Sequence, residues 1–340
     1  MGLTSKDRVL LSILGKKDEV DRIAVTSVNQ AVTLEQMDSL GVYWPEGHKD
    51  AQKMAQLGMA AYKQCGLEAV HSPFDQTIEA EIMGCTINYG NTKDAIPTVF
   101  FQGYKDPGEV PIPENFLEKG RIPMVLKAIE IMKKEVGEEA PIISNVNGPF
   151  SLGGQLAEIN NLFMMLMTDP EKVKGFAEIG IDLIAEFANA QLDAGADVVA
   201  VADMLAGADV LTPKLYKTYA APYNSTCIKK INEPKILYVC GPVEPIIEEM
   251  INTGAICISV GNGTNLEQAV PPTRGRCTIM GCINTTSVLL DTKPETVKKH
   301  VIDAIKAGVD LVAPGCFILP QTKNENIKAM VEAAKEYCTT

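Results

Sequence analysis

The chain has 340 residues and a formal net charge of −12, with 22% charged and 46% hydrophobic residues. This acidic balance argues against nucleic acid or an anionic membrane surface as the main partner. No apolar run approaches the roughly 18 residues of a membrane span, and residues 1–8 are too polar for a signal peptide. We therefore expect a cytoplasmic protein whose nine cysteines are mostly reduced thiols.

Short apolar runs alternate with amphipathic stretches along most of the chain. After a capping helix that starts at Thr4, the predicted strands are residues 23–26, 69–71, 142–146, 198–203, 236–240, 257–260, 278–282 and 311–314. The predicted helices of the second half are residues 170–194, 213–231, 243–253, 294–307 and 324–337. Residues 85–121 are rich in Gly and Pro, which is typical of hairpins and long loops.

Continuous apolar strands separated by helices indicate a parallel sheet that is buried on both faces. Such a series of units closes into a barrel more readily than it opens into a doubly wound sheet. The sequence therefore predicts an α/β protein with a (β/α)₈ TIM-type barrel and an N-terminal helical/hairpin extension. Nothing marks a domain boundary, so a single barrel domain over residues 1–340 is expected.

A barrel of this type carries its chemistry where the strands end, at the C-terminal face. The polar residues expected at this rim are His71, Asp75, Asn145, Asn147, Asp203, Cys240, Asn262, Cys282, Asn284 and Cys316. Arg274 and Arg276 precede a strand and are expected at the opposite face.

Two of these rim residues, Cys240 and Cys316, form a candidate metal site. Cys240 ends one strand and Cys316 follows the last one, so both are expected at the same rim. Paired thiolates are good Zn²⁺ ligands, and a zinc ion with an open position holds a substrate thiol as a thiolate near neutral pH. The alternative is that both are buried cysteines at strand ends.

Several segments resemble one enzyme family in order and spacing. They are residues 72–75 (Ser-Pro-Phe-Asp), 79–81, 83–85, 147–150 (Asn-Gly-Pro-Phe), 203 with 211–213, 236–241 (Ile-Leu-Tyr-Val-Cys-Gly), 313–316 (Ala-Pro-Gly-Cys) and 323–330. Over nearly the whole chain, these segments resemble the methylcobamide:coenzyme M methyltransferases of the uroporphyrinogen decarboxylase superfamily. The resemblance implies a zinc ion held by a His-x-Cys pair and a distant Cys.

The sequence departs from this pattern at two places. Cys240 and Cys316 match the family's cysteines, but Tyr238 stands where the His is expected. Three alternatives follow: Tyr238 ligates zinc as a phenolate, Cys282 or Asp203 replaces it, or the site has lost zinc. The turn at residues 260–265 is neutral where the family tends to carry an acidic residue. The thiol substrate and the direction of methyl transfer therefore stay open.

The resemblance implies a corrinoid-dependent methyltransferase. It would move a methyl group from a methyl-Co(III) corrinoid, carried by a partner protein docked over the barrel mouth, to a zinc-activated thiol such as coenzyme M. The alternative is demethylation of a small methylated substrate onto cob(I)alamin, with Asp203 or Tyr238 as general acid. A third hypothesis is a tetrapyrrole- or corrinoid-binding barrel without turnover. Some members of the superfamily dimerise, so a homodimer is one expected state.

Decarboxylation of a carboxylate-rich tetrapyrrole is not expected, because the first hundred residues contain only Arg8 and Arg22.

The remaining rim candidates each have a structural alternative. His71 is a ligand, an acid/base group or a hydrogen-bonded structural residue. Asp203 closes an apolar run, where a carboxylate is costly unless it is used or paired. For Asn147 and Asn284 the two alternatives are binding of a substrate or corrinoid and hydrogen bonding to the backbone of a loop.

Residues outside the rim are assigned structural positions. His48 and His300 lie in polar helical contexts and are expected to be solvent-exposed. The run Met-Met-Leu-Met at residues 164–167 is expected to pack in a helix core rather than contact a cofactor.

Overall fold

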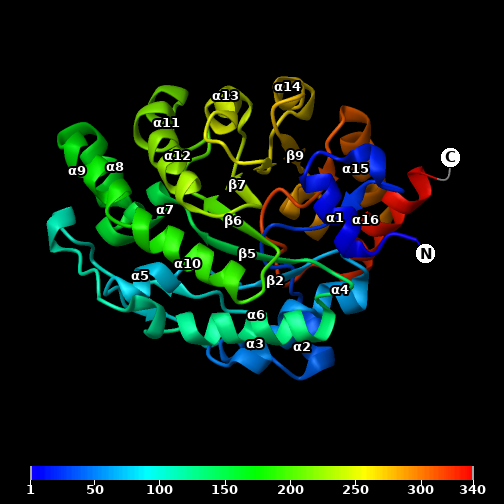
Figure 1. Ribbon diagram of the computed structural model, residues 1–340, viewed down its shortest axis with the longest axis horizontal. Coiled ribbons are helices and arrows are strands. Elements are labelled where there is room, and N and C mark those ends of the chain that lie inside the picture. The colour runs from blue at the N-terminus through cyan, green and yellow to red at the C-terminus, as the bar shows by residue number, and fades with distance from the viewer. Residues whose placement is uncertain (1, 339–340) are drawn as a thin grey trace.

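The computed structural model describes residues 2–338, and its main sheet contains eight parallel strands that curl around a common interior (Figure 1). The strands are β1 (Ala24–Val25), β2 (Val70–Ser72), β5 (Ile142–Asn147), β6 (Val198–Asp203), β7 (Lys235–Val239), β8 (Cys257–Val260), β9 (Thr278–Met280) and β10 (Leu311–Val312). Their order in the sheet is β1-β10-β9-β8-β7-β6-β5-β2. The predicted (β/α)₈ TIM-type fold is confirmed.

The helices surround this sheet. They are α1 (Ser5–Ile13), α2 (Leu34–Leu40), α3 (Ala51–Gly58), α4 (Ala60–Cys65), α5 (Ile78–Ile82), α6 (Ile122–Val136), α7 (Pro149–Ala157), α8 (Ile159–Thr168), α9 (Pro170–Glu178), α10 (Ile181–Asp193), α11 (Pro213–Tyr219), α12 (Ala221–Lys230), α13 (Ile247–Ile251), α14 (Leu266–Ala269), α15 (Pro294–Ala307) and α16 (Asn324–Tyr337). No helix within residues 2–338 is long and apolar enough to cross a membrane.

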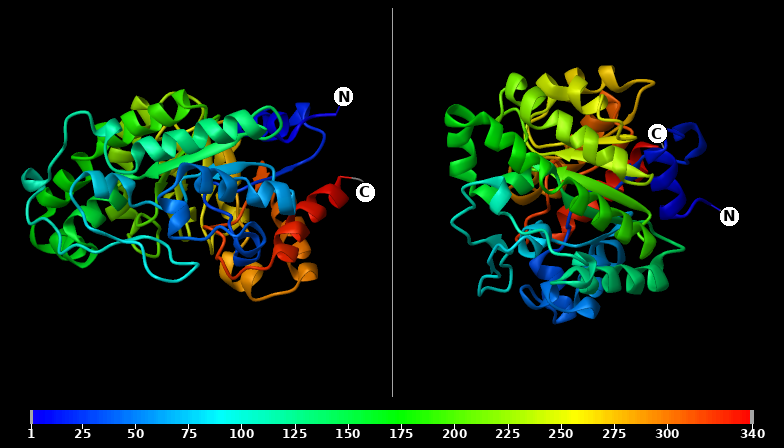
Figure 2. Two further views of the ribbon diagram at one scale, coloured as in Figure 1. Left: turned by 90° about the horizontal axis from the view of Figure 1, so that it is seen from below. Right: turned by 60° about the vertical axis from the view of Figure 1, so that its left-hand side comes forward.

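The observed strands follow the predicted ones, with ends that differ by one or two residues. The predicted helix at residues 170–194 divides into α9 and α10 at Gly180, and the predicted helix at residues 243–253 is a 3₁₀ turn followed by the short α13. The predicted helix at residues 213–231 divides into α11 and α12 because Pro222 lies in the first turn of α12, and proline has no N–H to continue a helix. The loose segment at residues 85–121 contains the short hairpin of β3 (Ile87–Asn88) and β4 (Thr98–Val99) together with loops, as predicted. In Figures 1 and 2 this segment lies at the opposite end from the two termini.

The interior of the barrel is filled by small and medium apolar side chains from alternate strand positions. Ala200 and Ala202 on β6 pack in the barrel interior with Ile236 and Tyr238 on β7. Residues at every second strand position share one face, so Cys240, two positions after Tyr238, continues the inward-facing row. The barrel alternation thus directs Tyr238 and Cys240 toward the same central space.

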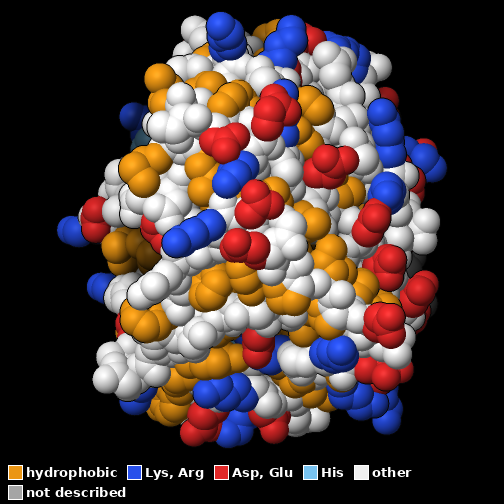
Figure 3. Space-filling model, turned by 90° about the vertical axis from the view of Figure 1, so that its left-hand side faces the viewer, with side chains coloured by type: hydrophobic (Ala, Val, Ile, Leu, Met, Phe, Trp, Pro, Cys, Tyr) orange, Lys and Arg blue, Asp and Glu red, His pale blue; other side chains and the backbone are white. Residues whose placement is uncertain are grey.

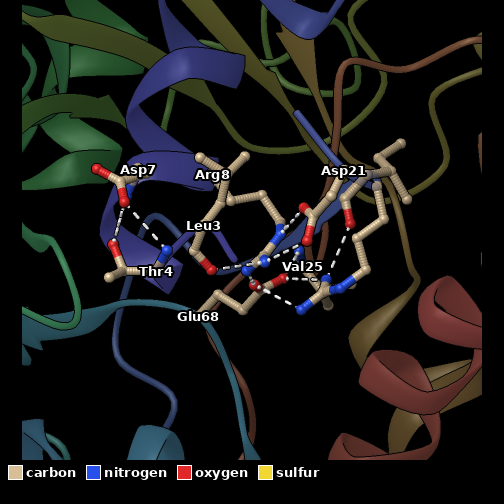
Figure 4. Close-up of polar contacts among 9 residues, drawn as sticks. Leu3, Thr4, Asp7, Arg8, Asp21, Val25 and Glu68 are labelled. Carbon is tan, nitrogen blue, oxygen red and sulfur yellow. Dashed lines mark hydrogen bonds and ion pairs between the residues drawn. The ribbon is translucent and has the colours of Figure 1, made fainter. Parts of the chain in front are cut away.

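Helix α1 covers the other end of the barrel, and its Arg8 reaches a buried ion-pair cluster (Figure 4). The Glu68 carboxylate accepts hydrogen bonds from Arg8 Nη1 at 2.5 Å, Arg22 Nη1 at 2.7 Å and the Val25 backbone N–H at 2.9 Å. Asp21 pairs with Arg8 Nε at 2.7 Å. The backbone N–H of Glu68 also donates to the Val25 carbonyl at 2.9 Å. Glu68 therefore links β1 to the segment before β2, where the barrel closes.

Candidate active site at the C-terminal end of the barrel

Two cysteine thiols meet where β7 and β10 end. Cys240 follows β7 directly, Cys316 lies in the loop after β10, and their Sγ atoms are 3.4 Å apart. Cys316 is buried and Cys240 is partly exposed. The barrel thus brings together, at one rim, the two thiols that the sequence placed there.

The thiol pair is electrostatically asymmetric. The hydrogen bond with Cys316 lowers the pKa of the Cys240 thiol to about 6. The same hydrogen bond, together with burial, raises the pKa of Cys316. One proton shared between two close sulfurs therefore leaves a thiolate on the more exposed Cys240 near neutral pH.

Tyr238 lies directly beneath the thiol pair. Its ring is fully buried in the barrel interior, and its hydroxyl donates to the Gly315 carbonyl at 3.2 Å. Burial, followed by the two neighbouring cysteines, raises the pKa of Tyr238 well above 10. The phenol is therefore a neutral hydrogen-bond donor at physiological pH in the structure as it stands.

Cys282 does not join this group. Its thiol donates to the Gly261 carbonyl at 2.8 Å, and its side chain packs with the outer core rather than with the barrel interior. Within residues 2–338, no three or more His, Cys, Asp or Glu side chains form a group able to hold a metal ion. Of the four predicted metal ligands, the structure assembles Cys240, Cys316 and Tyr238.

Asp203 lies at the end of β6 with no exposed surface. Its Oδ1 accepts from the Ser151 backbone N–H at 2.8 Å and from the Ser151 hydroxyl at 2.7 Å, and its Oδ2 accepts from Asn224 at 2.8 Å. A side chain on Gly148 would come within 2.3 Å of the Asp203 Cβ, so only glycine allows this approach. Asp203 therefore fixes the first turn of α7 and, through it, the position of Ser151.

The two predicted substrate-binding asparagines hold loop backbone. Asn147 Nδ2 donates to the Gln76 carbonyl at 2.7 Å and to Glu79 at 2.9 Å. The Asn284 carbonyl oxygen accepts from the backbone N–H groups of Thr286 and Ser287, at 3.1 and 2.9 Å. These contacts correspond to the structural alternative for both residues, while substrate contact stays a prediction.

His71 is a buried residue of β2. Its Nε2 lies 2.8 Å from the Ser27 carbonyl, which requires the proton on that nitrogen. Burial lowers its pKa to about 4, so the imidazole is neutral at physiological pH. The ring ties β2 to the loop after β1.

Replacing His71 with glutamine should change how stability depends on pH. The unfolded chain binds a proton at His71 near pH 6.5, whereas the folded chain does so only near pH 4. Folding stability contributed by the neutral ring is therefore complete above pH 6.5 and is lost as the pH falls from 6.5 to 4, by about 3 kcal/mol. Urea unfolding of both proteins between pH 7.5 and 4 measures this difference. The exposed His300→Gln variant is the control, and identical slopes for His71→Gln and wild type would contradict the assignment.

The expectation that His48 is solvent-exposed was wrong. His48 has no exposed surface, and its Nδ1 lies 3.0 Å from Asp75 Oδ2. Arg121 Nη1 binds the same carboxylate at 2.9 Å, and Arg121 Nε binds Glu81 at 2.6 Å. Burial opposes ionisation of Asp75, but the Arg121 charge and the contact with His48 hold the pKa of this carboxyl well below its usual range. This network anchors the loop after β2, and Arg121 was not among the residues predicted for the site.

A pocket of about 520 Å³ opens at this end of the barrel. It lies between the β3–β4 hairpin, the loop after β2, α7 and the ends of β6 and β10. Its lining residues are Asn29, Phe74, Asp75, Gln76, Thr77, Ile96, Pro97, Thr98, Val99, Phe101, Ser151, Gly154, Gln155, Glu158, Ile159, Met204, Leu205 and Phe317. Phe317 directly follows Cys316, so the pocket adjoins the thiol pair.

Helix α8 borders this pocket, and the expectation that its Met-rich run is core was wrong for two residues. Met164 is 61% exposed and Met167 is 88% exposed. Leu162 is the buried residue of this helix, and Ile159, which lines the pocket, is 38% exposed. The ten residues of α8 include no charged side chain. An apolar, uncharged helix face is therefore left open to solvent beside the pocket.

The fold and the thiol pair define a barrel protein with two adjacent cysteine thiols at its C-terminal mouth. The chain belongs to the uroporphyrinogen decarboxylase (URO-D) family, whose model matches residues 4–337. It is 35% identical over 338 residues to the methylcobamide:CoM methyltransferase MtaA of Methanosarcina barkeri, covering 98% of each chain. It is 30% identical to the methylated-thiol–coenzyme M methyltransferase of Methanosarcina mazei, covering 98% of this chain and 90% of the relative.

The solved structures agree. A methyltransferase from Methanosarcina mazei superposes with a TM-score of 0.93 at 32% identity, covering 98% of this chain and 99% of that chain. The resemblance to the methylcobamide:coenzyme M methyltransferases that the sequence predicted is confirmed.

Proposed function

We propose that the protein is a corrinoid-dependent methyltransferase that moves a methyl group from a methyl-Co(III) corrinoid to a thiol such as coenzyme M. It does so as one barrel domain. The single observation that carries this proposal is the pair of thiols, 3.4 Å apart, at the mouth of the barrel. The full-length similarity to relatives named for methylcobamide and coenzyme M supports the choice of substrates.

The thiol pair fits a zinc ion. Two thiolates on one tetrahedral Zn²⁺ lie about 3.8 Å apart, given Zn–S bonds of about 2.3 Å, and the observed 3.4 Å needs only a small shift. Cys240 and Cys316 would hold the ion, and the phenol oxygen of Tyr238 is the third donor in reach. When bound, zinc would keep the acceptor thiol ionised at neutral pH.

The residues of this chain have little acid/base work in the transfer. The acceptor sulfur attacks the methyl carbon in line, the S–C bond forms, and the Co–C bond breaks with both electrons leaving on cobalt as Co(I). The thiol proton goes to solvent. The rim therefore aligns the two reactants and excludes water, and both effects contribute strongly to the rate of such displacements. Asp203 and Ser151 support this by holding α7 at the pocket wall.

The methyl donor would be delivered by a corrinoid protein docked over the barrel mouth. Figure 3 looks onto the end of the molecule that carries α8, and hydrophobic side chains are grouped there between scattered charged ones. Met164 and Met167 belong to the exposed apolar face of α8 beside the pocket. Flexible methionine side chains adapt to a partner surface.

The first experiment is a transfer assay with methylcobalamin and coenzyme M. Loss of the methyl–cobalt absorbance that depends on both protein and thiol supports the proposal. The reverse half-reaction is the second candidate, favoured by Tyr238 in place of histidine. If a methylated thiol methylates cob(I)alamin and the forward reaction is absent, the result supports the reverse half-reaction. Corrinoid binding with neither reaction would contradict both and leave a binding barrel.

A further inference from the structure

A second pocket, of about 410 Å³, lies at the end of the barrel opposite the thiol pair. The C-terminal end of α1 forms one side, and the residues that directly precede β8, β9 and β10 form the other. The N-terminal ends of parallel barrel strands meet at one face, whereas the thiol pair lies where the strands end. The proposed methyl transfer uses no residue of this pocket. A ligand bound there would therefore be separate from the transfer reaction.

The polar lining of this pocket is cationic. Lys17, Arg274 and Arg276 belong to it, and Asp310 is the only carboxylate among its described lining residues. The whole chain has a formal net charge of −12, so three cations around one cavity depart from its average. By contrast, the lining described for the pocket at the barrel mouth contains no Lys or Arg. A concave surface with an excess of positive charge attracts anions.

Asp310 positions two of the cations but does not neutralise all three. Its Oδ1 pairs with Lys17 Nζ at 2.9 Å and with Arg274 Nη1 at 3.5 Å, so two positive charges converge on one carboxylate oxygen. Arg276 pairs with Glu248 at 2.8 Å, outside the lining. Two carboxylates thus balance two of the three cations. The three cationic side chains are 39–51% exposed, so N–H donors of each remain accessible to a ligand.

The carbonyl groups at the end of α1 oppose an anion less than the end of a helix usually does. The C-terminal end of a helix is partly negative because its last carbonyls have no intrahelical partner. Here the Ile13 carbonyl accepts from Thr278 Oγ1 at 3.0 Å, and the Ser12 carbonyl accepts from the Gly15 backbone N–H at 3.1 Å. These two carbonyls are therefore already hydrogen-bonded on the side of the pocket.

Beside the cations, the pocket has an apolar lining that consists of Ile13, Leu14 and Ile256. Leu14 is 52% exposed, and a ligand that covers it would remove apolar surface from water. Pockets for small organic molecules have volumes of about 300–1,000 Å³, and this pocket falls within that range. The cavity thus combines a cationic side with an apolar side, which suits an anionic group carried on an apolar body.

We infer that this pocket binds a phosphate monoester with an apolar or aromatic body, of the size of a nucleoside monophosphate. The phosphate lies against Lys17, Arg274 and Arg276, because a dianion needs more than one cation and the guanidinium fork matches phosphate oxygens. The body of the ligand covers the apolar lining. The protein therefore has a second ligand site at the face of the barrel that is remote from the thiol pair.

Isothermal titration calorimetry on the purified full chain tests this inference with adenosine 5′-monophosphate, inorganic phosphate and adenosine as probes. The nucleotide should bind saturably and at least about 10-fold more tightly than either fragment, because only the nucleotide uses both sides of the pocket. The double variant Lys17→Gln with Arg276→Gln removes two cations and leaves the buried Asp310 paired with Arg274. It should weaken nucleotide binding at least about 10-fold. Leu14→Glu, at an exposed position of the apolar lining, should weaken it by a similar factor.

The matched control is Lys127→Gln with Lys230→Gln, which removes the same charge from two exposed ion pairs outside the pocket. It should leave nucleotide affinity within about 2-fold of wild type. Absence of saturable nucleotide binding, equal affinity for inorganic phosphate, or equal effects of the pocket and control variants overturns the inference. The transfer assay with methylcobalamin and coenzyme M is read separately, so either result there leaves this test unchanged.

Discussion

Replacing Cys240 or Cys316 with serine is expected to lower thiol methylation by about 1,000-fold, equivalent to ~4 kcal/mol of transition-state stabilisation. Each variant removes one of two sulfurs that lie 3.4 Å apart and that we propose as zinc ligands. A serine hydroxyl is a far poorer zinc ligand than a thiolate. Zinc content, measured on protein purified without added metal, should fall from about one ion per chain to a small fraction.

Two further variants separate ligation from packing. Cys282→Ser is the matched control, because the Cys282 thiol bonds to the Gly261 carbonyl and lies outside the pair, so zinc and activity should persist. Tyr238→Phe keeps the buried ring and removes only its oxygen. Loss of zinc in this variant assigns Tyr238 as a ligand. If the variant keeps its zinc, Tyr238 has only a packing role. A wild-type protein that is folded and contains no zinc would contradict the thiol-activating site.

Replacing Glu68 with glutamine should give the largest loss of stability, about 3–5 kcal/mol in the free energy of unfolding. The carboxylate is buried and accepts from Arg8, Arg22 and the Val25 backbone. The substitution leaves the guanidinium groups without this counter-charge and turns an amide N–H₂ toward them. Arg8 keeps its pairing with Asp21, but the loss of the buried carboxylate shared by both arginines is costly because their remaining charge is poorly solvated. Urea unfolding followed by circular dichroism measures the change.

An exposed ion pair provides the comparison for Glu68. Glu130 pairs with Lys127 at 2.7 Å, but both side chains are more than half exposed. Glu130→Gln should therefore change the free energy of unfolding by less than about 1 kcal/mol. Equal effects for the two substitutions would show that the Glu68 cluster does not hold the barrel closed.

The arginines of the first hundred residues and the arginine at the barrel mouth are engaged in ion pairs. The first hundred residues supply only Arg8 and Arg22, and both pair with Glu68 at the α1 end of the barrel, where Figure 4 labels Arg8 and Glu68. At the mouth, Arg121 is held by Asp75 and Glu81. No arginine is left in the described lining of the pocket at the barrel mouth to bind substrate carboxylates. The expectation that the protein is not a decarboxylase stays a prediction.

The sequence by itself determined the strands and the rim. Each buried parallel strand is a short apolar run. Successive side chains of a strand point to opposite faces, so a strand that is buried on both faces has apolar residues at consecutive positions. Once the strands are placed, a closed barrel requires Cys240 and Cys316 to lie at one end, whatever their separation in the chain. The position of Tyr238 also follows, because alternate residues of β7 face the same side.

Only the tertiary structure decided which side chains meet across elements. His48 is polar and lies in a polar segment, yet it is buried beside the rings of Trp44 and Phe74. Its Nδ1 lies 3.0 Å from Asp75, and such a polar partner makes the burial tolerable. Met164 and Met167 have the composition of a core, yet no element within residues 2–338 covers that face of α8. Burial is a property of what packs against a residue, and local sequence does not contain that information.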